Sequence, residues 1–236
     1  MNRPTPGLLI LAATEFELAD FLDSHSHQCH KKRSGLTLYT GTGWDCLITG
    51  PGVFNTASGL GAYLENHLPS LVVDTGIAGV FEASGLDIGD LAIAGQEQYL
   101  HTGVGDSAPL PFDLIDGQPL TREGVYSMDR TLVDQYKEII KTQNGLPVAM
   151  GPFLTVSAIT ADSGRAGELF NRYSPIMEAM EGAAAAHVCA LYQVPMIEVR
   201  AGSNLVGERD KANWDFSLAC GGVTQICQAL LAVLQD

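Results

Sequence analysis

Two glutamates follow the first apolar segment of the chain, where a carboxylate could act as a general acid or base. Residues 8–12 have the length and composition of a buried strand, and Glu15 and Glu17 come directly after it. Open α/β sheets bind ligands beyond the carboxyl ends of their strands. Acidic residues are also favoured in the first turn of a helix through its dipole alone. This segment by itself leaves both interpretations open.

A third glutamate, Glu181, lies in the sequence Met180-Glu181-Gly182, at the start of a stretch rich in small residues. A carboxylate can accept hydrogen bonds from both hydroxyls of a vicinal diol, with charge-assisted strength. In isolation, a helix cap explains Glu181 equally well. The neighbouring Glu178 is interpreted as solvated or structural.

A polar segment that ends in Asn204 follows another strand-like run, residues 195–199. A loop of small residues at the carboxyl end of a strand would let one polar side chain face a planar ligand. A Gly/Asn turn without any ligand accounts for the same residues. Asn204 is nevertheless of interest because its carboxamide can both donate and accept a hydrogen bond.

Two further patterns are weaker signals of chemistry. Residues 41–43 read Gly-Thr-Gly, but they lack the third glycine and the following helix of a dinucleotide-binding motif. Alternating histidines and a cysteine in a polar segment without distant partners are typical of a solvated loop. That second pattern comprises His25, His27, Cys29 and His30. We expect no metal site and no cofactor.

The elements that must position these side chains alternate between strands and helices. Strands are predicted over residues 8–12, 36–40, 45–49, 71–74, 90–94, 153–159 and 195–200, and helices over 15–22, 55–67, 132–142, 179–192 and 214–234. Such alternation predicts an α/β fold whose parallel or mixed sheet is covered on both faces. Residues 99–128 contain three prolines and four glycines, which predicts a long functional loop.

Composition sets the class of protein. The 236 residues predict one domain over residues 1–236, and a net charge of −14 makes a nonspecific hold on nucleic acid or anionic lipid unfavourable. No continuous apolar run reaches the length of a membrane span, and no signal-type leader is apparent at the start. The five cysteines include no CxxC pair, which favours reduced thiols. We expect a cytoplasmic protein with no nucleic-acid or membrane partner.

Taken together, these segments resemble the purine nucleoside phosphorylase and nucleosidase superfamily over nearly the whole chain. Methylthioadenosine/adenosylhomocysteine nucleosidases carry a Met-Glu-Ala helix ending in Ala-His-Val-Cys, a Val-Pro strand and Arg-Ala-Ile-Ser-Asp. Residues 180–189, 194–195 and 199–204 match these motifs, while residues 13–17 and 75–79 match a Glu-rich turn and Thr-Gly-Ser-Ala-Gly. The resemblance implies a three-layer α/β fold with a central mixed sheet, no cofactor, and a homo-oligomer that binds a small nucleoside.

The resemblance also implies a role for individual residues. Glu17 matches the carboxylate that activates the attacking water, and Asn204 is the second catalytic residue, acting on the base. Glu181 matches the group that binds the ribose hydroxyls, and Met180 the residue that packs on the sugar. The substrate-binding residues implied are Met180, Glu181, Ile159, Thr160, Ile77, Ala78 and Gly79.

Two departures from the family pattern bear on the reaction. Phosphorylases of this superfamily hold phosphate with Arg-x-Gly-Ser, but residues 74–77 here read Asp-Thr-Gly-Ile. An acid and an aliphatic side chain cannot satisfy a dianion, so water is the expected nucleophile. Adenine-releasing nucleosidases carry Asp at position 204. A carboxamide can accept from a protonated N7 and donate to O6, which favours hypoxanthine- or guanine-like bases.

The pattern Ser-Asn-x-Val-Gly-x-Arg-Asp, followed by Trp214, covers residues 203–214 and is similar to futalosine hydrolases of menaquinone biosynthesis. This similarity implies hydrolysis of the N-glycosidic bond of futalosine to hypoxanthine and dehypoxanthinyl futalosine. The alternatives are a methylthioadenosine/adenosylhomocysteine-type or other purine nucleosidase, and a nucleoside-binding protein without activity. Arg122 and His101 are candidates for the carboxylate on the 5′ side of futalosine.

Overall fold

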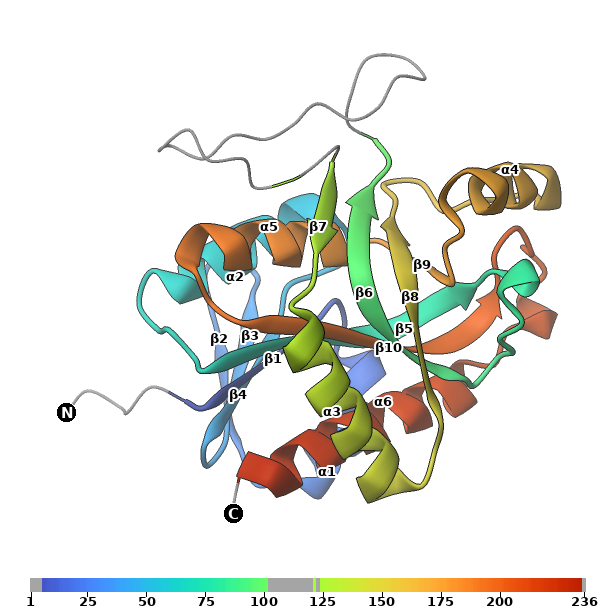
Figure 1. Cartoon of the computed structure of the whole chain (residues 1–236). Coiled ribbons are helices and arrows are strands. Elements are labelled where there is room, and N and C mark those ends of the chain that lie inside the picture. Colours follow the sequence, from blue (N-terminus) through green and yellow to red (C-terminus); the bar gives the residue numbers. More distant parts are fainter. Residues whose placement is uncertain (1–5, 102–120, 122–123, 235–236) are drawn as a thin grey trace.

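A mixed sheet organises the chain. The computed structural model describes residues 6–101, 121 and 124–234. Within these ranges ten strands join in one sheet (Figure 1). They are β1 (Leu8–Ala12), β2 (Gln28–Lys31), β3 (Thr37–Thr40), β4 (Trp44–Ile48), β5 (Leu71–Val80), β6 (Leu91–Tyr99), β7 (Val125–Ser127), β8 (Val148–Thr155), β9 (Met177–Ala179) and β10 (Met196–Leu205).

Five of the strands close on themselves. β5 pairs with β10, β10 with β6, β6 with β8, β8 with β9, and β9 again with β5. From β5 the sheet continues outward through β1, β4, β3 and β2. The pairings β1–β4, β1–β5, β5–β10, β6–β8 and β8–β9 are parallel, and the others are antiparallel. The carboxyl ends of β1, β5 and β10 therefore meet on one side, where a ligand can be held, while β6, β8 and β9 run in the opposite direction.

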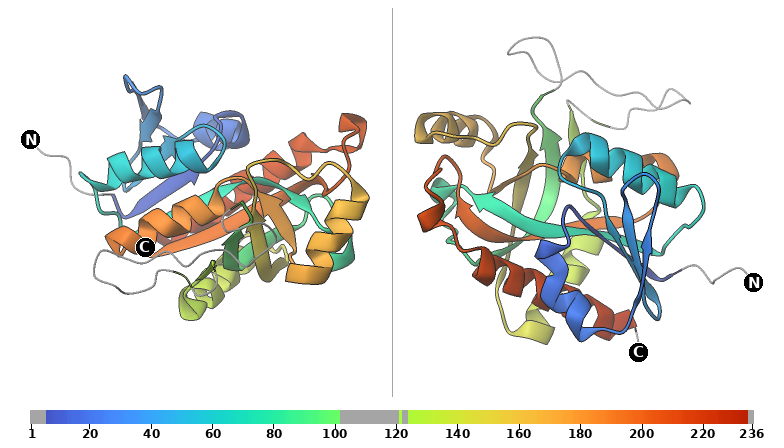
Figure 2. Two further views of the ribbon diagram at one scale, coloured as in Figure 1. Left: turned by 90° about the horizontal axis from the view of Figure 1, so that it is seen from above. Right: turned by 180° about the vertical axis from the view of Figure 1, so that it is seen from behind.

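Helices cover both faces of this sheet, as Figures 1 and 2 show. α2 (Val53–Leu64) and α5 (Gly182–Tyr192) pack together on one face, while α1 (Ala19–Ser24), α3 (Arg130–Asn144) and α6 (Phe216–Leu234) lie on the other. α4 (Ser163–Tyr173) lies beside the ring of strands. Short 3-10 turns occur at Phe16–Leu18, Glu82–Ser84 and Lys211–Asn213. The α/β fold with a mixed sheet flanked by helices is confirmed.

The two helices nearest the sheet owe their position to small or apolar side chains. Residues 182–186 at the start of α5 are a glycine and four alanines, all buried, which lets the helix backbone lie close to the strands. α6 is long and apolar enough, by length and composition, to cross a membrane. Its buried residues Ala219, Val223, Ile226 and Leu230 instead belong to the main hydrophobic core, beside β5 and β10.

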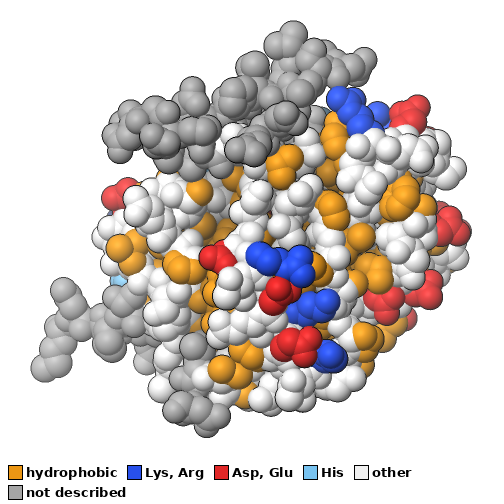
Figure 3. Space-filling view, in the orientation of Figure 1, with side chains coloured by type: hydrophobic (Ala, Val, Ile, Leu, Met, Phe, Trp, Pro, Cys, Tyr) orange, Lys and Arg blue, Asp and Glu red, His pale blue; other side chains and the backbone are white. Residues whose placement is uncertain are grey.

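The outward face of α3 is polar, in contrast. Figure 3 shows acidic and basic side chains alternating on this side of the molecule. Two ion pairs lie along the helix, Arg130–Asp134 at 2.8 Å and Lys141–Glu138 at 3.4 Å. The side chains of both pairs are well exposed, so solvent screening leaves each pair with little effect on stability. Buried Val133 and Ile140 on the opposite face hold α3 to the sheet.

Several predicted boundaries were wrong. β10 continues through Asn204 to Leu205, because β5 extends beside it as a parallel partner, so the predicted loop there is a strand. The helix predicted from residue 179 begins at Gly182, since Met177–Ala179 forms β9 between β8 and β5. β8 spans Val148–Thr155 rather than 153–159. Its Gly-Pro pair at 151–152 lies opposite a β-bulge in β6, and such residues resemble a strand end in sequence.

Other elements were missed. α4 and β2 bury few apolar side chains: Leu169 is the one residue of α4 that is fully buried, and all four residues of β2 are exposed. Within the predicted loop 99–128, Tyr99 belongs to β6 and residues 125–127 form β7, which pairs with β6. Residues 102–120 and 122–123 of that segment lie outside the described residues.

Candidate active site

A cavity of about 310 Å³ lies where the ends of β1, β5, β8, β9 and β10 converge. It brings together most of the residues proposed from the sequence: Glu17, Ile77, Ala78, Gly79, Ile159, Met180, Glu181 and Asn204. Thr160 does not line it; this residue is buried behind the wall and donates hydrogen bonds to Glu178. The remaining lining includes Thr14, Phe16, Pro51, Val156, Ser203, Trp214 and Phe216.

Glu17 is buried at the carboxyl end of β1 and held from two sides. Its Oε2 accepts hydrogen bonds from the backbone N and the Oγ1 of Thr14, both at 2.8 Å. Its Oε1 accepts from the backbone N of Ile77 at 3.0 Å. Burial raises the pKa of Glu17, although these bonds and the Arg200 charge lower it in part. A carboxylate with a raised pKa that contacts a cavity can act as a general base.

Gly76 makes this position of Glu17 possible. Its φ is +153°, and a Cβ there would lie 2.4 Å from Glu17 Oε1 and 2.9 Å from Arg200 Nη1. Any other residue would therefore displace the carboxylate or the guanidinium. Gly76 is therefore needed because it lets the carboxylate of Glu17 and the guanidinium of Arg200 lie close to the backbone of β5.

Glu181 faces the same cavity from the residue before α5. Its Oε1 accepts from the backbone N of Gly52 at 2.9 Å, and its Oε2 accepts from the N of Met180 at 3.2 Å. The side chain makes no capping hydrogen bond to α5. Glu181 therefore occupies the N-cap position of α5 without its side chain capping the helix, and its carboxylate is held by the backbone of the distant Gly52 and of the adjacent Met180.

Arg200 lies beneath both carboxylates and is almost completely buried. Its Nε is 2.6 Å from Glu198 Oε1, and its Nη2 is 2.9 Å from Asp74 Oδ2 and 3.6 Å from Glu181 Oε2. Burial alone would lower the pKa of Arg200, but the surrounding carboxylates raise it well above its usual value. A guanidinium in this cage is already matched by three acidic side chains.

Glu97 is a further buried carboxyl group, and it lies close to Glu198, one of the partners of Arg200. A Cβ on Gly182 would lie 2.2 Å from Glu198 Oε2 and 2.5 Å from Glu97 Oε1, so the two carboxyl groups converge on this glycine. Glu97 Oε2 accepts from Thr155 Oγ1 at 2.7 Å. Burial and then the Glu198 charge raise the pKa of Glu97 well above its usual value. Burial beside a second carboxyl group therefore favours the protonated form of Glu97.

Asn204 occupies the opposite end of the cavity from β1. Its Oδ1 accepts from Ser203 Oγ at 2.8 Å, and its Nδ2 donates to the carbonyl of Leu205 at 3.0 Å. One acceptor position on the oxygen and one N–H remain for a ligand. Because Asn204 lies within β10, the sheet fixes its backbone more firmly than the predicted loop would.

Three aromatic side chains form an apolar wall that the sequence reasoning missed. Phe16 and Phe216 meet edge to face at 6.0 Å, and Phe216 and Trp214 do so at 5.5 Å. Phe16 is 59% exposed, which is unusual for so large an apolar side chain. The Phe between Glu15 and Glu17 was the available signal, since an exposed aromatic beside a carboxylate favours ligand contact over core packing.

Glu178 was interpreted as solvated or structural, and the expectation that it is solvated was wrong. It is only 5% exposed and lines the cavity next to Ala179. Its Oε1 accepts from the N of Thr160 at 2.9 Å and its Oε2 from Thr160 Oγ1 at 2.5 Å. The sequence concealed it because β9 has only three residues, too few for a visible alternation of buried and exposed positions.

Of the two side chains proposed to bind the carboxylate on the 5′ side of futalosine, the structure describes one. Arg122 lies outside the described residues. His101 Nδ1 accepts a hydrogen bond from the N of Ser157 at 3.0 Å. His101 lines a small hollow with Arg165, and this hollow adjoins the main cavity through their shared lining residues Val156 and Ile159.

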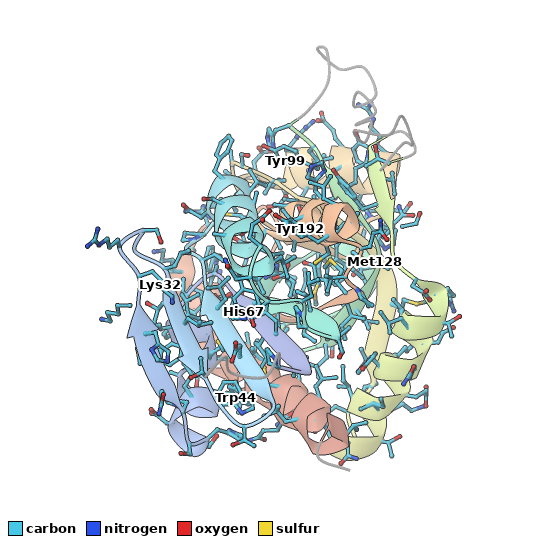
Figure 4. The ribbon with its side chains drawn as sticks, turned by 90° about the vertical axis from the view of Figure 1, so that its left-hand side faces the viewer. Lys32, Trp44, His67, Tyr99, Met128 and Tyr192 are labelled. Atoms are coloured by element: carbon cyan, nitrogen blue, oxygen red, sulfur yellow. The ribbon has the colours of Figure 1, made fainter. Side chains whose placement is uncertain are left out.

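A larger hollow, of about 770 Å³, lies between α2 and β3 and is remote from this chemistry. Lys32 and His67, labelled in Figure 4, line it, but it contains no carboxylate. Volume alone does not identify a site, so we place the candidate active site at the smaller, acid-lined cavity. Among the described residues, no group of three or more His, Cys, Asp or Glu side chains is arranged to hold a metal ion.

Relatives with known names share both sequence and fold. The chain is 30% identical over 178 residues to the 5′-methylthioadenosine/S-adenosylhomocysteine nucleosidase of Bacillus subtilis (strain 168), covering 75% of this chain and 74% of the relative. It is 31% identical over 196 residues to the enzyme of that name from Chromohalobacter salexigens, with 81% and 80% covered.

Solved structures extend the likeness of fold. The nucleosidase of Neisseria meningitidis, in complex with methylthio-immucillin-A, matches with a TM-score of 0.80 at 19% identity, covering 96% of this chain and 98% of that one. A futalosine hydrolase mutant of Helicobacter pylori strain 26695 matches with a TM-score of 0.82 at 16% identity, covering 97% and 99%. The family model described as the phosphorylase superfamily matches residues 8–234. The chain therefore belongs to the phosphorylase superfamily.

Proposed function

We propose that this protein is a purine nucleosidase that hydrolyses the N-glycosidic bond of futalosine and releases hypoxanthine. One observation carries the proposal: the neutral carboxamide of Asn204 shares a single cavity with the buried carboxylates of Glu17 and Glu181. In this arrangement one group can address the base, one the sugar and one the water. The names of the relatives support the reaction class, and the sequence at position 204 supports the base.

Water is the nucleophile favoured by the charges beneath the cavity. A phosphate dianion needs cationic or neutral donors, yet Arg200 is already surrounded by Asp74, Glu198 and Glu181. Adding a dianion to this group of carboxylates would cost several kcal/mol of repulsion and desolvation. Water carries no such cost, so the proposed reaction is hydrolysis and not phosphorolysis.

The proposed mechanism separates charge across the breaking bond. As the bond stretches, the ribose becomes cationic, and the carboxylate of Glu181 near its hydroxyls stabilises that charge. The departing base takes a proton on N7 from a water molecule in the cavity, and Asn204 accepts a hydrogen bond from that N7–H and donates one to O6. Glu17, whose pKa is raised mainly by burial, takes a proton from the attacking water. Met180 packs on the sugar, while Ile159 and the backbone of 77–79 lie along the base.

The choice of futalosine rests on the segment 203–214. Trp214 of that motif forms part of the cavity wall, and its indole N–H donates to the carbonyl of Glu208 at 3.2 Å. The guanidinium of Arg209 lies 5.2 Å from the Trp214 ring centroid. These contacts give the motif a physical purpose, because they hold an aromatic surface against the ligand. An aromatic wall suits a substrate that carries a phenyl group.

A second candidate substrate is methylthioadenosine. The relatives that are 30–31% identical are named for it, and the apolar wall would also accept a thioether. Asn204 is the feature that opposes this candidate, because a neutral amide binds adenine and hypoxanthine with different hydrogen-bond patterns.

The deciding experiment is a substrate panel. Purified protein is incubated separately with futalosine, inosine and methylthioadenosine, and free base is measured by chromatography. Hypoxanthine released from futalosine at the highest kcat/KM supports the proposal. Faster release of adenine from methylthioadenosine would refute the base assignment, and ribose 1-phosphate formed on adding phosphate would refute hydrolysis. No release of base from any substrate would leave a nucleoside-binding protein.

A variant tests the role of Glu17. Glu17→Gln keeps the size of the side chain but cannot take a proton, so kcat is expected to fall by about 100- to 10,000-fold while nucleoside binding remains. Glu15→Gln, two residues away and exposed, is the matched control and should leave kcat unchanged. Unchanged hydrolysis by the Glu17 variant would remove this residue from the mechanism.

The cellular setting follows the same proposal. A cytoplasmic enzyme, one domain over residues 1–236, and assembly into a homo-oligomer all remain expectations from sequence. Gel filtration with light scattering tests the assembly directly.

A further inference from the structure

We propose that Glu178 determines which purine the cavity accepts, by receiving a hydrogen bond from the N1–H of a 6-oxopurine. This inference rests on the proposed base-releasing function and extends it to a residue outside the reacting groups. Glu178 is buried, lines the cavity and lies on β9, a strand that carries none of Glu17, Glu181 and Asn204.

The position of Glu178 follows from the register of three neighbouring strands. Gly79 on β5 pairs with Glu178 on one side and with Asn204 on the other. Adjacent strands are about 4.8 Å apart, so the two polar residues flank a strip of backbone about 10 Å wide. A Cβ at Gly79 would lie 2.9 Å from Val206 Cγ2 and 3.5 Å from Asn204 Nδ2. Because Gly79 lines the cavity and carries no side chain, the surface between the carboxamide and the carboxyl group is backbone, on which a flat ring can lie.

Glu178 is held in a form suited to accept hydrogen bonds. Each of its oxygens already accepts one from Thr160, at 2.9 Å and 2.5 Å, and each retains a second acceptor position. Burial raises the pKa of Glu178, while the two Thr160 bonds and the charge of Arg165 lower it in part. The donors around Glu178 thus favour a carboxylate that still has acceptor capacity for a ligand.

The chemistry of the bases makes this position selective. Hypoxanthine and guanine carry a hydrogen on N1, next to O6, whereas adenine presents a bare N1 lone pair. With Asn204 on the N7 and O6 side of the ring, a carboxylate on the N1 side would accept from the 6-oxopurines and repel adenine. A charge-assisted hydrogen bond of this kind corresponds to about 10- to 150-fold in discrimination.

A purely structural role makes a different prediction. If Glu178 only holds Thr160 and the segment after β8, its replacement would reduce turnover of every nucleoside by the same factor. If it contacts N1, its replacement would change the ratio between bases. The ratio is therefore the measurement that separates the two roles.

The test compares inosine, adenosine and 1-methylinosine, in which a methyl group replaces the N1 hydrogen. The wild-type protein is expected to cleave inosine with a kcat/KM about 10- to 150-fold above that for 1-methylinosine. In Glu178→Gln, whose amide can donate to adenine, the inosine-to-adenosine ratio should fall at least tenfold. Glu82→Gln, an exposed site in the 3-10 turn after β5, is the control and should keep the wild-type ratio.

Two outcomes would overturn the inference: equal cleavage of inosine and 1-methylinosine by the wild-type protein, or an unchanged base ratio in Glu178→Gln. Calorimetry with free hypoxanthine, 1-methylhypoxanthine and adenine separates this failure from failure of the proposed function. A protein that cleaves no nucleoside but binds hypoxanthine in a Glu178-dependent way retains the inference and loses the enzyme. A protein that hydrolyses futalosine, but whose inosine-to-adenosine ratio does not depend on Glu178, retains the proposed function and loses the inference.

Discussion

Gly76 leaves space for the carboxylate of Glu17, the proposed general base, and replacing Gly76 with alanine tests whether this space is needed. The added Cβ would lie 2.4 Å from Glu17 Oε1 and 2.9 Å from Arg200 Nη1, both shorter than van der Waals contact. The carboxylate must move, and its hydrogen bond from the N of Ile77 is lost. Because Glu17 is the proposed general base, we expect kcat to fall by about 100-fold or more. A 100-fold loss corresponds to about 2.7 kcal/mol of transition-state stabilisation.

Backbone strain must be separated from displacement of the carboxylate. Gly76 has a positive φ, so alanine there also costs about 1–3 kcal/mol of folding free energy. Gly85→Ala is the matched control: its φ is +79°, but a Cβ there meets nothing within 4 Å. Both variants should lower the melting temperature, by about 2–4 °C for each kcal/mol. Only Gly76→Ala should lose activity.

The assay is release of base at saturating substrate, with the melting temperature measured on the same samples. If Gly76→Ala is folded and its kcat stays within about threefold of wild type, catalysis does not depend on the position of Glu17 beside Gly76. An equal loss of activity in Gly85→Ala would assign the effect to strain alone. Either result would refute the reasoning.

The remaining predictions concern pH and base choice. Because burial raises the pKa of Glu17, kcat should fall as pH decreases through a value above 4.5, seen as the acidic limb of a pH–rate profile. Thr14→Val removes a hydrogen bond that lowers that pKa, so the limb should move to higher pH; a shift to lower pH would contradict this. Asn204→Asp should lower the inosine-to-methylthioadenosine ratio of kcat/KM by about 5- to 150-fold, and a constant ratio would place Asn204 away from the base. The pKa of Glu97 is raised in the folded state, so its protonated form adds stability at low pH that is lost as pH rises through the folded pKa. Glu97→Gln, neutral at every pH, should weaken this alkaline decline in melting temperature, and identical profiles would contradict the raised pKa of Glu97.

Much of the fold was readable because its signals are local. Short apolar runs bounded by glycine predicted β1, β3, β4 and the start of β5, and small residues predicted α5. The predicted boundaries of several strands were wrong. β10 continues through Asn204 only because β5 continues beside it, and such pairing between distant segments leaves no periodic trace in either one.

The candidate site also could be predicted only where the signal is local in the sequence. Glu17 and Asn204 follow apolar runs, so their approach to a common cavity could be expected from the order of elements, whereas the role of Glu181 was implied by the family resemblance. Glu178 could not be recognised, because its burial depends on β9 closing against β5 and β8. The carboxyl groups beneath Arg200 were also invisible, since Glu97 and Glu198 read as ordinary polar residues inside strands until the ring of strands brings them together.

The closed ring of five strands has a consequence for how the protein matures. Its final member, β10, comes from residues 196–205 and must insert between β5 and β6, which pair with it from about a hundred residues earlier. Contacts between segments so far apart form late, after the entropy of closing the long intervening chain has been overcome. Arg200 and Asn204 both arrive on that strand. A growing chain can therefore hold much of its secondary structure and still lack a complete cavity until β10 has been synthesised.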